Sequence, residues 1–102
     1  MITIGVRDID VTVIGGTGTA IVSSVAGGEI HGILYYVGIK APTTISVFTL
    51  SVYDRDGFLL YTENPITGIG YVAFERPINS NVRITLTTAT NGVYNVRLRY
   101  AS

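Results

Sequence analysis

The chain has 102 residues, no cysteine, and seven basic residues balanced by seven acidic ones. The lack of cysteine excludes disulfides and zinc–thiolate sites, and the neutral charge balance excludes a general attraction to nucleic acid or anionic membranes. Hydrophobic residues make up 47% and charged residues 14%, which predicts one folded domain over residues 1–102. Because charged residues usually reach about 25%, either the interior is unusually apolar or another molecule covers part of the surface.

Short apolar or alternating segments, separated by turn residues, follow one another along the whole chain. Side chains of a strand point alternately to its two faces, so these segments predict strands. The expected strands are 2–6, 9–14, 19–25, 30–39, 44–53, 58–62, 71–75, 82–89 and 93–100. No window has the period of a helix. The sequence therefore predicts an all-β fold, a single-domain antiparallel β-sandwich of about eight short strands with either jelly-roll or immunoglobulin-like topology.

The N-terminal segment 1–8 lacks the basic residues and long apolar run of a secretion signal, so synthesis in the cytoplasm is expected. The longest apolar run, 33–37, is far shorter than the roughly 20 residues that span a bilayer, so no membrane segment is predicted. Residues 1–8 are short and weakly patterned, which makes them a candidate extended arm. In that arm, Ile2, Ile4 and Val6 would add a strand to the sheet edge of a neighbouring protein.

No catalytic, cofactor-binding or metal-binding site is predicted. Residues Asp54 to Gly57 contain the first steps of a calcium loop, but the apolar residues that follow at once favour a hairpin turn. His31 is the only histidine and is expected to be partly exposed at the start of a strand. The acidic residues are scattered through turns and suggest no pair of facing carboxylates. We therefore expect that the protein is not an enzyme.

Tyrosine dominates the aromatic residues, with seven tyrosines against three phenylalanines and no tryptophan. Sugars stack on aromatic faces, so this composition is compatible with carbohydrate binding. Tyr94 and Tyr100 alternate in register with apolar residues and are expected in the core. Tyr61 and Tyr71 flank a Pro/Gly loop and are the better candidates for an exposed contact.

The last two expected strands, 82–89 and 93–100, are predicted to pair as a hairpin. A three-residue loop ending at Gly92 sets apolar residues opposite one another, for example Leu86 opposite Val96. Glycine suits the left-handed conformation that commonly ends such a loop. The sequence therefore predicts that the two strands are neighbours in one sheet.

The same register places Arg83 opposite Arg99 on the outer face, with Arg97 nearby. Like charges directly across a strand pair cost about 0.2–1 kcal/mol. One interpretation is a solvated face with the guanidinium groups splayed apart. The other is an interface with a protein that supplies carboxylates, since arginine is favoured at interfaces. Three arginines without interleaved aromatic residues do not indicate nucleic-acid binding.

From Gly28 onward, about three-quarters of the chain resembles small structural proteins encoded beside the major capsid gene of tailed bacteriophages. Residues 28–35 read Gly-x-Ile-x-x-Ile-x-Tyr, and residues 41–44 are Ala-Pro-Thr-Thr. A short Asp/Gly turn at 54–57 and a Pro-Ile pair at 77–78 follow. Residues 83–100 read x-Ile-Thr-Leu-Thr-x-Ala-Thr-x-Gly-x-Tyr-x-Val-x-Leu-x-Tyr.

This resemblance implies a head decoration protein, also called a cement protein, which binds the outside of the assembled capsid and stabilises it. It implies the major capsid protein as partner, a homo-oligomer (a trimer is favoured and a dimer is possible), and a place on the virion exterior. Members of this family often carry Asp after the Thr-Thr pair, where this chain has Ile45. No functional residue is carried over at that position.

Two other functions fit the same sequence. The first is a carbohydrate-binding β-sandwich module, which predicts an exposed aromatic platform around Tyr61 and Tyr71. The second is a phage tail or connector subunit, which would assemble into rings instead of decorating a shell. In all three cases the outward side chains bind other molecules and the interior gives stability.

Overall fold

The computed structural model describes residues 4–24 and 27–101. It contains eight strands: β1 (Ile4–Val13), β2 (Gly18–Val22), β3 (Ile30–Lys40), β4 (Val47–Asp54), β5 (Leu59–Thr67), β6 (Ile69–Ser80), β7 (Val82–Thr87) and β8 (Gly92–Ala101). No helix is present among the described residues, and hence none that could span a membrane. The prediction of an all-β domain is confirmed.

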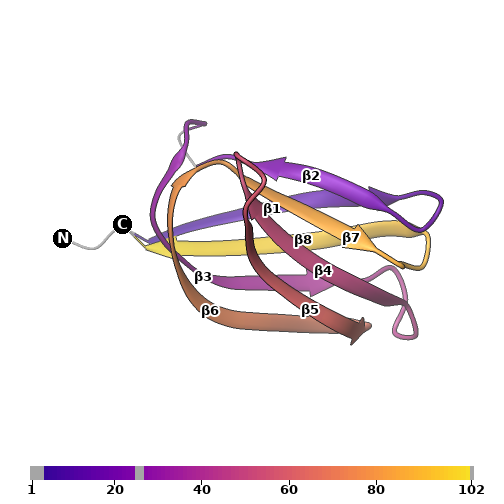
Figure 1. Cartoon of the computed structure of the whole chain (residues 1–102). Helices are drawn as coiled ribbons and strands as arrows, with labels where there is room; N and C mark the ends of the chain where they lie inside the picture. The colour runs from indigo at the N-terminus through magenta and orange to yellow at the C-terminus, as the bar shows by residue number, and fades with distance from the viewer. Residues whose placement is uncertain (1–3, 25–26, 102) are drawn as a thin grey trace.

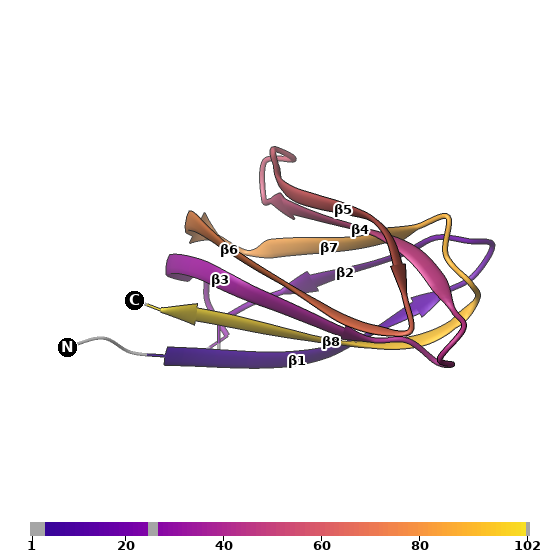
Figure 2. The same cartoon turned by 90° about the horizontal axis from the view of Figure 1, so that it is seen from below.

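The strands form two antiparallel four-stranded sheets that face each other (Figures 1 and 2). The first sheet has the order β1-β8-β3-β6, and the second has the order β2-β7-β4-β5. The chain passes from one sheet to the other at every connection except that between β4 and β5. This order is that of a jelly roll, so the strand topology resolves the choice between jelly-roll and immunoglobulin-like sandwiches that the sequence leaves open.

The core lies between the sheets and takes alternate residues from strands of both. The side chains of Phe48 from β4 and Tyr94 from β8 are fully buried and meet edge to face, with ring centroids 5.2 Å apart. Tyr100 is also buried, so both tyrosines expected in the core are confirmed there. Other fully buried side chains from the two sheets are Val11, Val22, Ile30, Leu34, Leu50, Ile84, Leu86, Val96 and Leu98.

The predicted pairing of the last two strands is wrong. β7 pairs with β2 and β4 in the second sheet, whereas β8 pairs with β1 and β3 in the first. Leu86 and Val96 are both buried as expected, but they belong to opposite layers of the core. An alternating pattern indicates which face of a strand is apolar. That face is buried equally well whether the two strands pair in one sheet or lie in opposite sheets of the sandwich. Arg83 and Arg99 are therefore not opposite each other.

The described part of the N-terminal segment is not a free arm. Residues 4–8 begin β1, and all five have partners in β8, from Ile4 opposite Ala101 to Asp8 opposite Arg97. Pairing with β8 continues without a break to Val13, so one long strand replaces the two short ones expected. Residues 1–3 of the proposed arm, Ile2 among them, lie outside the described residues.

Two proline-containing segments expected as a loop and a strand end are parts of strands. β5 continues through position 65, and β6 continues through Pro77 to Ser80. Both are edge strands of their sheets. Proline has no N–H to donate, which an edge strand tolerates because one side of it has no partner strand.

Candidate functional site

The outer face of the first sheet carries planar polar and aromatic side chains in rows that cross the four strands. Read from β1 through β8 and β3 to β6, three rows are Val6, Arg99, Tyr36 and Ala73; Asp8, Arg97, Gly38 and Tyr71; and Asp10, Asn95, Lys40 and Ile69. Carboxylate, guanidinium, amide and phenol groups are thus neighbours on one flat surface.

A bulge in β3 places three of these residues on the outer face. The register of β3 with both of its neighbours shifts between Leu34 and Tyr36. Before the shift, Ile30 and Leu34 point into the core; after it, Val37 and Ile39 do so. A bulge inserts one extra residue and thereby exchanges the two faces of the strand. Tyr36, Gly38 and Lys40 consequently reach the outer face.

The charged groups of the first sheet are held in place by their neighbours across the strands. The Arg97 guanidinium donates two hydrogen bonds to the Asp8 carboxylate, at 2.7 and 3.0 Å. These bonds hold the pKa of Asp8 below its ordinary value and raise that of Arg97. Asn95 donates through Nδ2 to Asp10 at 3.1 Å. Two planar side chains of β8 are therefore oriented by two carboxylates of β1.

Two aromatic rings and a guanidinium form a stack across the same face. The rings of Tyr36 and Tyr71 lie 18° from parallel with centroids 5.6 Å apart. The Arg99 guanidinium carbon lies 4.7 Å from the Tyr36 ring centroid. Tyr36 has Arg99 on its β8 side and Tyr71 on its β6 side, and Tyr71 remains 69% exposed. Tyr71 is thus an open aromatic surface on an ordered support.

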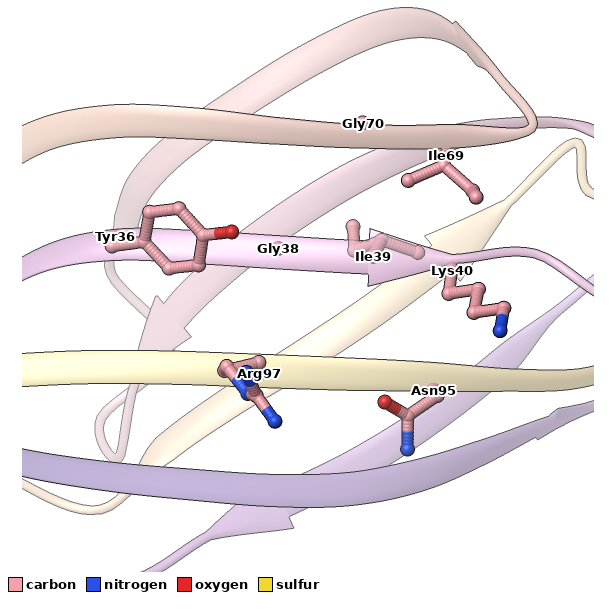
Figure 3. Close-up of a pocket in the computed structure, with 8 residues that line it drawn as sticks. All are labelled: Tyr36, Gly38, Ile39, Lys40, Ile69, Gly70, Asn95 and Arg97. Carbon is pink, nitrogen blue, oxygen red and sulfur yellow. The ribbon is translucent and has the colours of Figure 1, made fainter.

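A groove of about 260 Å³ lies beside this stack, over the part of the first sheet where β3 ends and β6 begins (Figure 3). Glycine at position 38 leaves space there, and the Tyr36 hydroxyl leans over it, 2.6 Å from where a Cβ would stand. Figure 3 shows the amide nitrogen of Asn95 directed toward β1 and its oxygen toward the groove. The lining residues are Tyr36, Gly38, Ile39, Lys40, Ile69, Gly70, Asn95 and Arg97.

A second candidate surface is the end of the sandwich opposite the chain termini, here called the loop end (Figure 1). It consists of the connections β1–β2 (14–17), β3–β4 (41–46), β5–β6 (68) and β7–β8 (88–91). None of these residues is charged. Ile14 is 77% exposed and Ile45 is 81% exposed, and Ile69 beside the β5–β6 connection is 70% exposed. The loop end is therefore neutral and bears large aliphatic side chains.

Hydrogen bonds join the connections of the loop end to one another or to the start of β4. Ala89 N donates to Gly16 O at 3.0 Å, which joins the β7–β8 and β1–β2 connections. Thr90 N donates to Val47 O at 3.0 Å, and Thr90 Oγ1 accepts from Val47 N at 3.2 Å. Gly68 N donates to the carbonyl oxygen of residue 46 at 2.8 Å. These contacts make the loop end one connected surface.

The opposite end of the sandwich is polar. Arg55 donates to Glu29 at 2.6 Å, and His31 is hydrogen-bonded to Asn79. The Asp54 carboxylate accepts from the backbone N–H groups of residues 56 and 58 at 2.9 and 3.0 Å. Residues 54–57 therefore form the hairpin turn that the sequence favours over a calcium loop.

The predicted interface residues do not form one surface. Arg97, Arg99 and Tyr71 share the outer face of the first sheet, near Ile4 and Val6 on β1. The other two described candidates, Arg83 and Tyr61, belong to the second sheet. The Arg83 guanidinium carbon lies 4.6 Å from the ring centroid of Tyr53. The Tyr61 hydroxyl donates a hydrogen bond to Glu63, which raises the pKa of Tyr61. Tyr61 is partly buried and forms no shared aromatic surface with Tyr71.

Sequence reasoning missed the groove and the loop end. Gly38 and Lys40 attract no attention in the sequence, because only the bulge in β3 brings them beside Arg97. A signal for the loop end was present: the segments 14–17, 41–46 and 88–91 contain isoleucine, glycine and threonine but no charge. The jelly-roll order is needed to know that these segments meet.

Within the residues that the structure describes, no three His, Asp or Glu side chains lie close enough together to hold a metal ion. The two candidate surfaces are suited to binding, through apolar contact at the loop end and through stacking and hydrogen bonding at the groove. A scan against protein-family models and a search of curated proteins both find no match for this chain.

Proposed function

We propose that this protein is a structural virion protein that binds the outer surface of a tailed-phage capsid and stabilises it. The sequence pattern from Gly28 onward supports this function, as does a jelly-roll domain whose exposed surface includes a neutral, aliphatic end. The partner is the major capsid protein, and the decorating unit is a homo-oligomer, with a trimer favoured.

The observation that carries the proposal is the uncharged, aliphatic surface of the loop end. The core of a protein–protein interface is depleted of charged residues. Fourteen charged residues are spread over the rest of this chain, and none lies in the four connections of the loop end. Ile14 and Ile45 point their side chains into solvent there, and such exposed apolar groups mark contact sites when they gather in one region. The loop end is accordingly the surface that faces the capsid.

The hydrogen bonds among the connections favour tight binding. A surface that is already ordered loses little conformational entropy when it docks. An oligomer presents several loop ends at once, so contacts with neighbouring capsid subunits reinforce one another through effective concentration. Binding of this kind is strong for the assembled lattice and weak for free capsid subunits, which is what a cement protein needs.

Co-sedimentation with purified capsids of the phage that encodes the chain tests this function. The wild-type protein is expected to pellet with expanded capsids and to stay in solution with unassembled capsid protein. Exchanging both loop-end isoleucines for aspartate, I14D/I45D, is expected to weaken binding by at least about tenfold, because each change buries a charge in the contact.

The matched control is Ile21→Asp, an exposed isoleucine on the outer face of the second sheet. This variant is expected to bind capsids like the wild type, and circular dichroism checks that all variants keep their β-structure. Wild-type protein that does not bind capsids contradicts the proposal. Protein that instead assembles into rings by itself supports a tail or connector subunit.

A further inference from the structure

The groove on the first sheet is a second binding site, which adjoins the loop end at Ile69 and Lys40. It lies on a sheet face, and the side chains that line it differ in chemistry from those of the loop end. An exposed tyrosine stack borders it, and cationic and amide groups form its rim. We infer that this groove binds an acidic saccharide, with one sugar ring packed beside the Tyr36–Tyr71 stack and a carboxylate directed to Lys40.

The size and shape of the groove fit a small ring. Its volume of about 260 Å³ is below the roughly 300–1,000 Å³ that is usual for drug-sized ligands. Because position 38 has no side chain, the Tyr36 ring lies close over the backbone there and forms one wall of the groove. An open groove on a flat sheet also allows an oligosaccharide to continue beyond the bound ring in either direction.

The aromatic stack supplies the apolar part of sugar recognition. The C–H groups on one face of a pyranose ring pack against the electron-rich face of an aromatic ring. Tyr71 lies directly opposite Gly38 in the β3–β6 register and is widely exposed. Its support by Tyr36, which is itself packed on Arg99, holds the ring in place before a ligand arrives.

The rim of the groove contains both hydrogen-bond donors and hydrogen-bond acceptors. A sugar hydroxyl both donates and accepts, so a saccharide site needs donors and acceptors together. Lys40 and Arg97 are donors, and the Asn95 oxygen that Figure 3 shows toward the groove is an acceptor. Asp8 and Asp10 orient Arg97 and Asn95 through the hydrogen bonds already described. An apolar peptide would leave these groups without partners.

The charge of the rim favours an acidic sugar over a neutral one. Arg97 is neutralised by Asp8. Among the described residues, the ion pairs involve Arg55 and Arg97 only, so Lys40 contributes a cation that no carboxylate of this part of the chain neutralises. A carboxylate on the sugar would form an ion pair with Lys40.

Binding is tested with the full chain by titrating oligogalacturonate, neutral oligogalactose and a glutamate-rich peptide, followed by nuclear magnetic resonance. Of these three ligands, only oligogalacturonate is expected to shift the backbone signals of residues 36–40 and 95–97. On a glycan array, the protein is expected to bind uronate or sialylated glycans. Tyr71→Ala is expected to weaken this binding by about 2- to 12-fold, which corresponds to the loss of one aromatic contact. Lys40→Gln is expected to weaken it by about 1.5- to 5-fold.

Gly38→Val is the variant that displaces the Tyr36 wall of the groove, since a side chain at position 38 would collide with the Tyr36 ring. It is expected to abolish saccharide binding. Phe58→Ala is the matched aromatic control, because Phe58 is 70% exposed at the polar end, and it is expected to leave binding unchanged. The Ile14 and Ile45 variants are expected to bind saccharide like the wild type, because neither residue lines the groove, so this inference and the capsid function fail or succeed independently.

Three results would overturn the inference. These are no binding of any acidic glycan on the array, binding of neutral sugars only, and equal binding of the glutamate-rich peptide. The last result would mean that the groove attracts any carboxylate and does not recognise a sugar ring.

Discussion

The two ends of this sandwich are built from the same strands but have opposite chemistry. The polar end carries Glu29, Arg55 and Asp56, and Arg55 pairs with Glu29. The loop end carries no charge in its four connections and exposes Ile14 and Ile45. The polar end also exposes an apolar side chain, that of Phe58, so the two ends differ mainly in charge. The uncharged surface of the loop end supports the proposal that it is the binding surface.

The largest expected effect comes from removing the side chain that supports the loop end from below. Phe48 lies one residue beyond the start of β4 and packs on Tyr94. Phe48→Ala is expected to lower the free energy of unfolding by about 3–5 kcal/mol, because it leaves a cavity in the core. Urea denaturation measures this change. Val47→Ala, at a neighbouring but outward-facing position, should lower the free energy of unfolding much less. Equal decreases from the two substitutions would mean that the loop end does not depend on the core.

A smaller effect is expected from one hydrogen bond between the core and the loop end. The Tyr94 hydroxyl donates to Thr90 O at 2.7 Å. Tyr94→Phe removes this bond and is expected to cost about 0.5–1.5 kcal/mol. The amides of residues 88–91 should also exchange with deuterium faster than in the wild type. Unchanged exchange would show that the loop end is ordered by its own contacts alone.

The ion pair on the first sheet gives an effect that depends on pH. Arg97 lowers the pKa of Asp8 in the folded protein, so the pair stabilises the fold above the ordinary carboxyl pKa. That stability is lost as the pH falls through the lowered pKa. Both side chains are about half exposed, at 46% and 47%, so solvent screening keeps the effect small. The Asp8 carboxyl signal followed by nuclear magnetic resonance should titrate below the usual range; an ordinary pKa would refute the pairing.

The smallest effect is expected at the polar end. Arg55→Ala breaks the contact with Glu29, which lies between exposed side chains and should contribute at most about 1 kcal/mol. The difference from wild type in urea denaturation should disappear at high salt, because salt screens exposed charges. A large, salt-independent loss would mean that the polar end is a structural element comparable to the loop end.

The sequence was sufficient for the strands and their faces but not for their partners. Ile84 and Leu98 are buried as their alternating patterns predict, because burial of one face is a local property of a strand. Sheet order depends on contacts between residues far apart in the chain, and for this reason the predicted hairpin of the last two strands was wrong. The sequence predicts strand ends near the edge prolines, because it does not say which strands lie at an edge.

The candidate site was harder to predict than the fold. Arg97, Arg99 and Tyr71 were singled out correctly as outward-facing, but their neighbours were unknown. Tyr36 and Lys40 reach the same face only through the extra residue in β3, and a bulge leaves no clear trace in a pattern of apolar residues. The loop end required the whole jelly-roll order before its four connections could be placed together.

Electron cryomicroscopy of capsids saturated with this protein tests the assignment of the loop end most directly. We predict ordered copies on the outer surface of the shell, with Ile14 and Ile45 against the capsid protein and Arg55 in solvent. Copies that touch the shell through the polar end, or capsids that remain bare at saturating concentration, would contradict it.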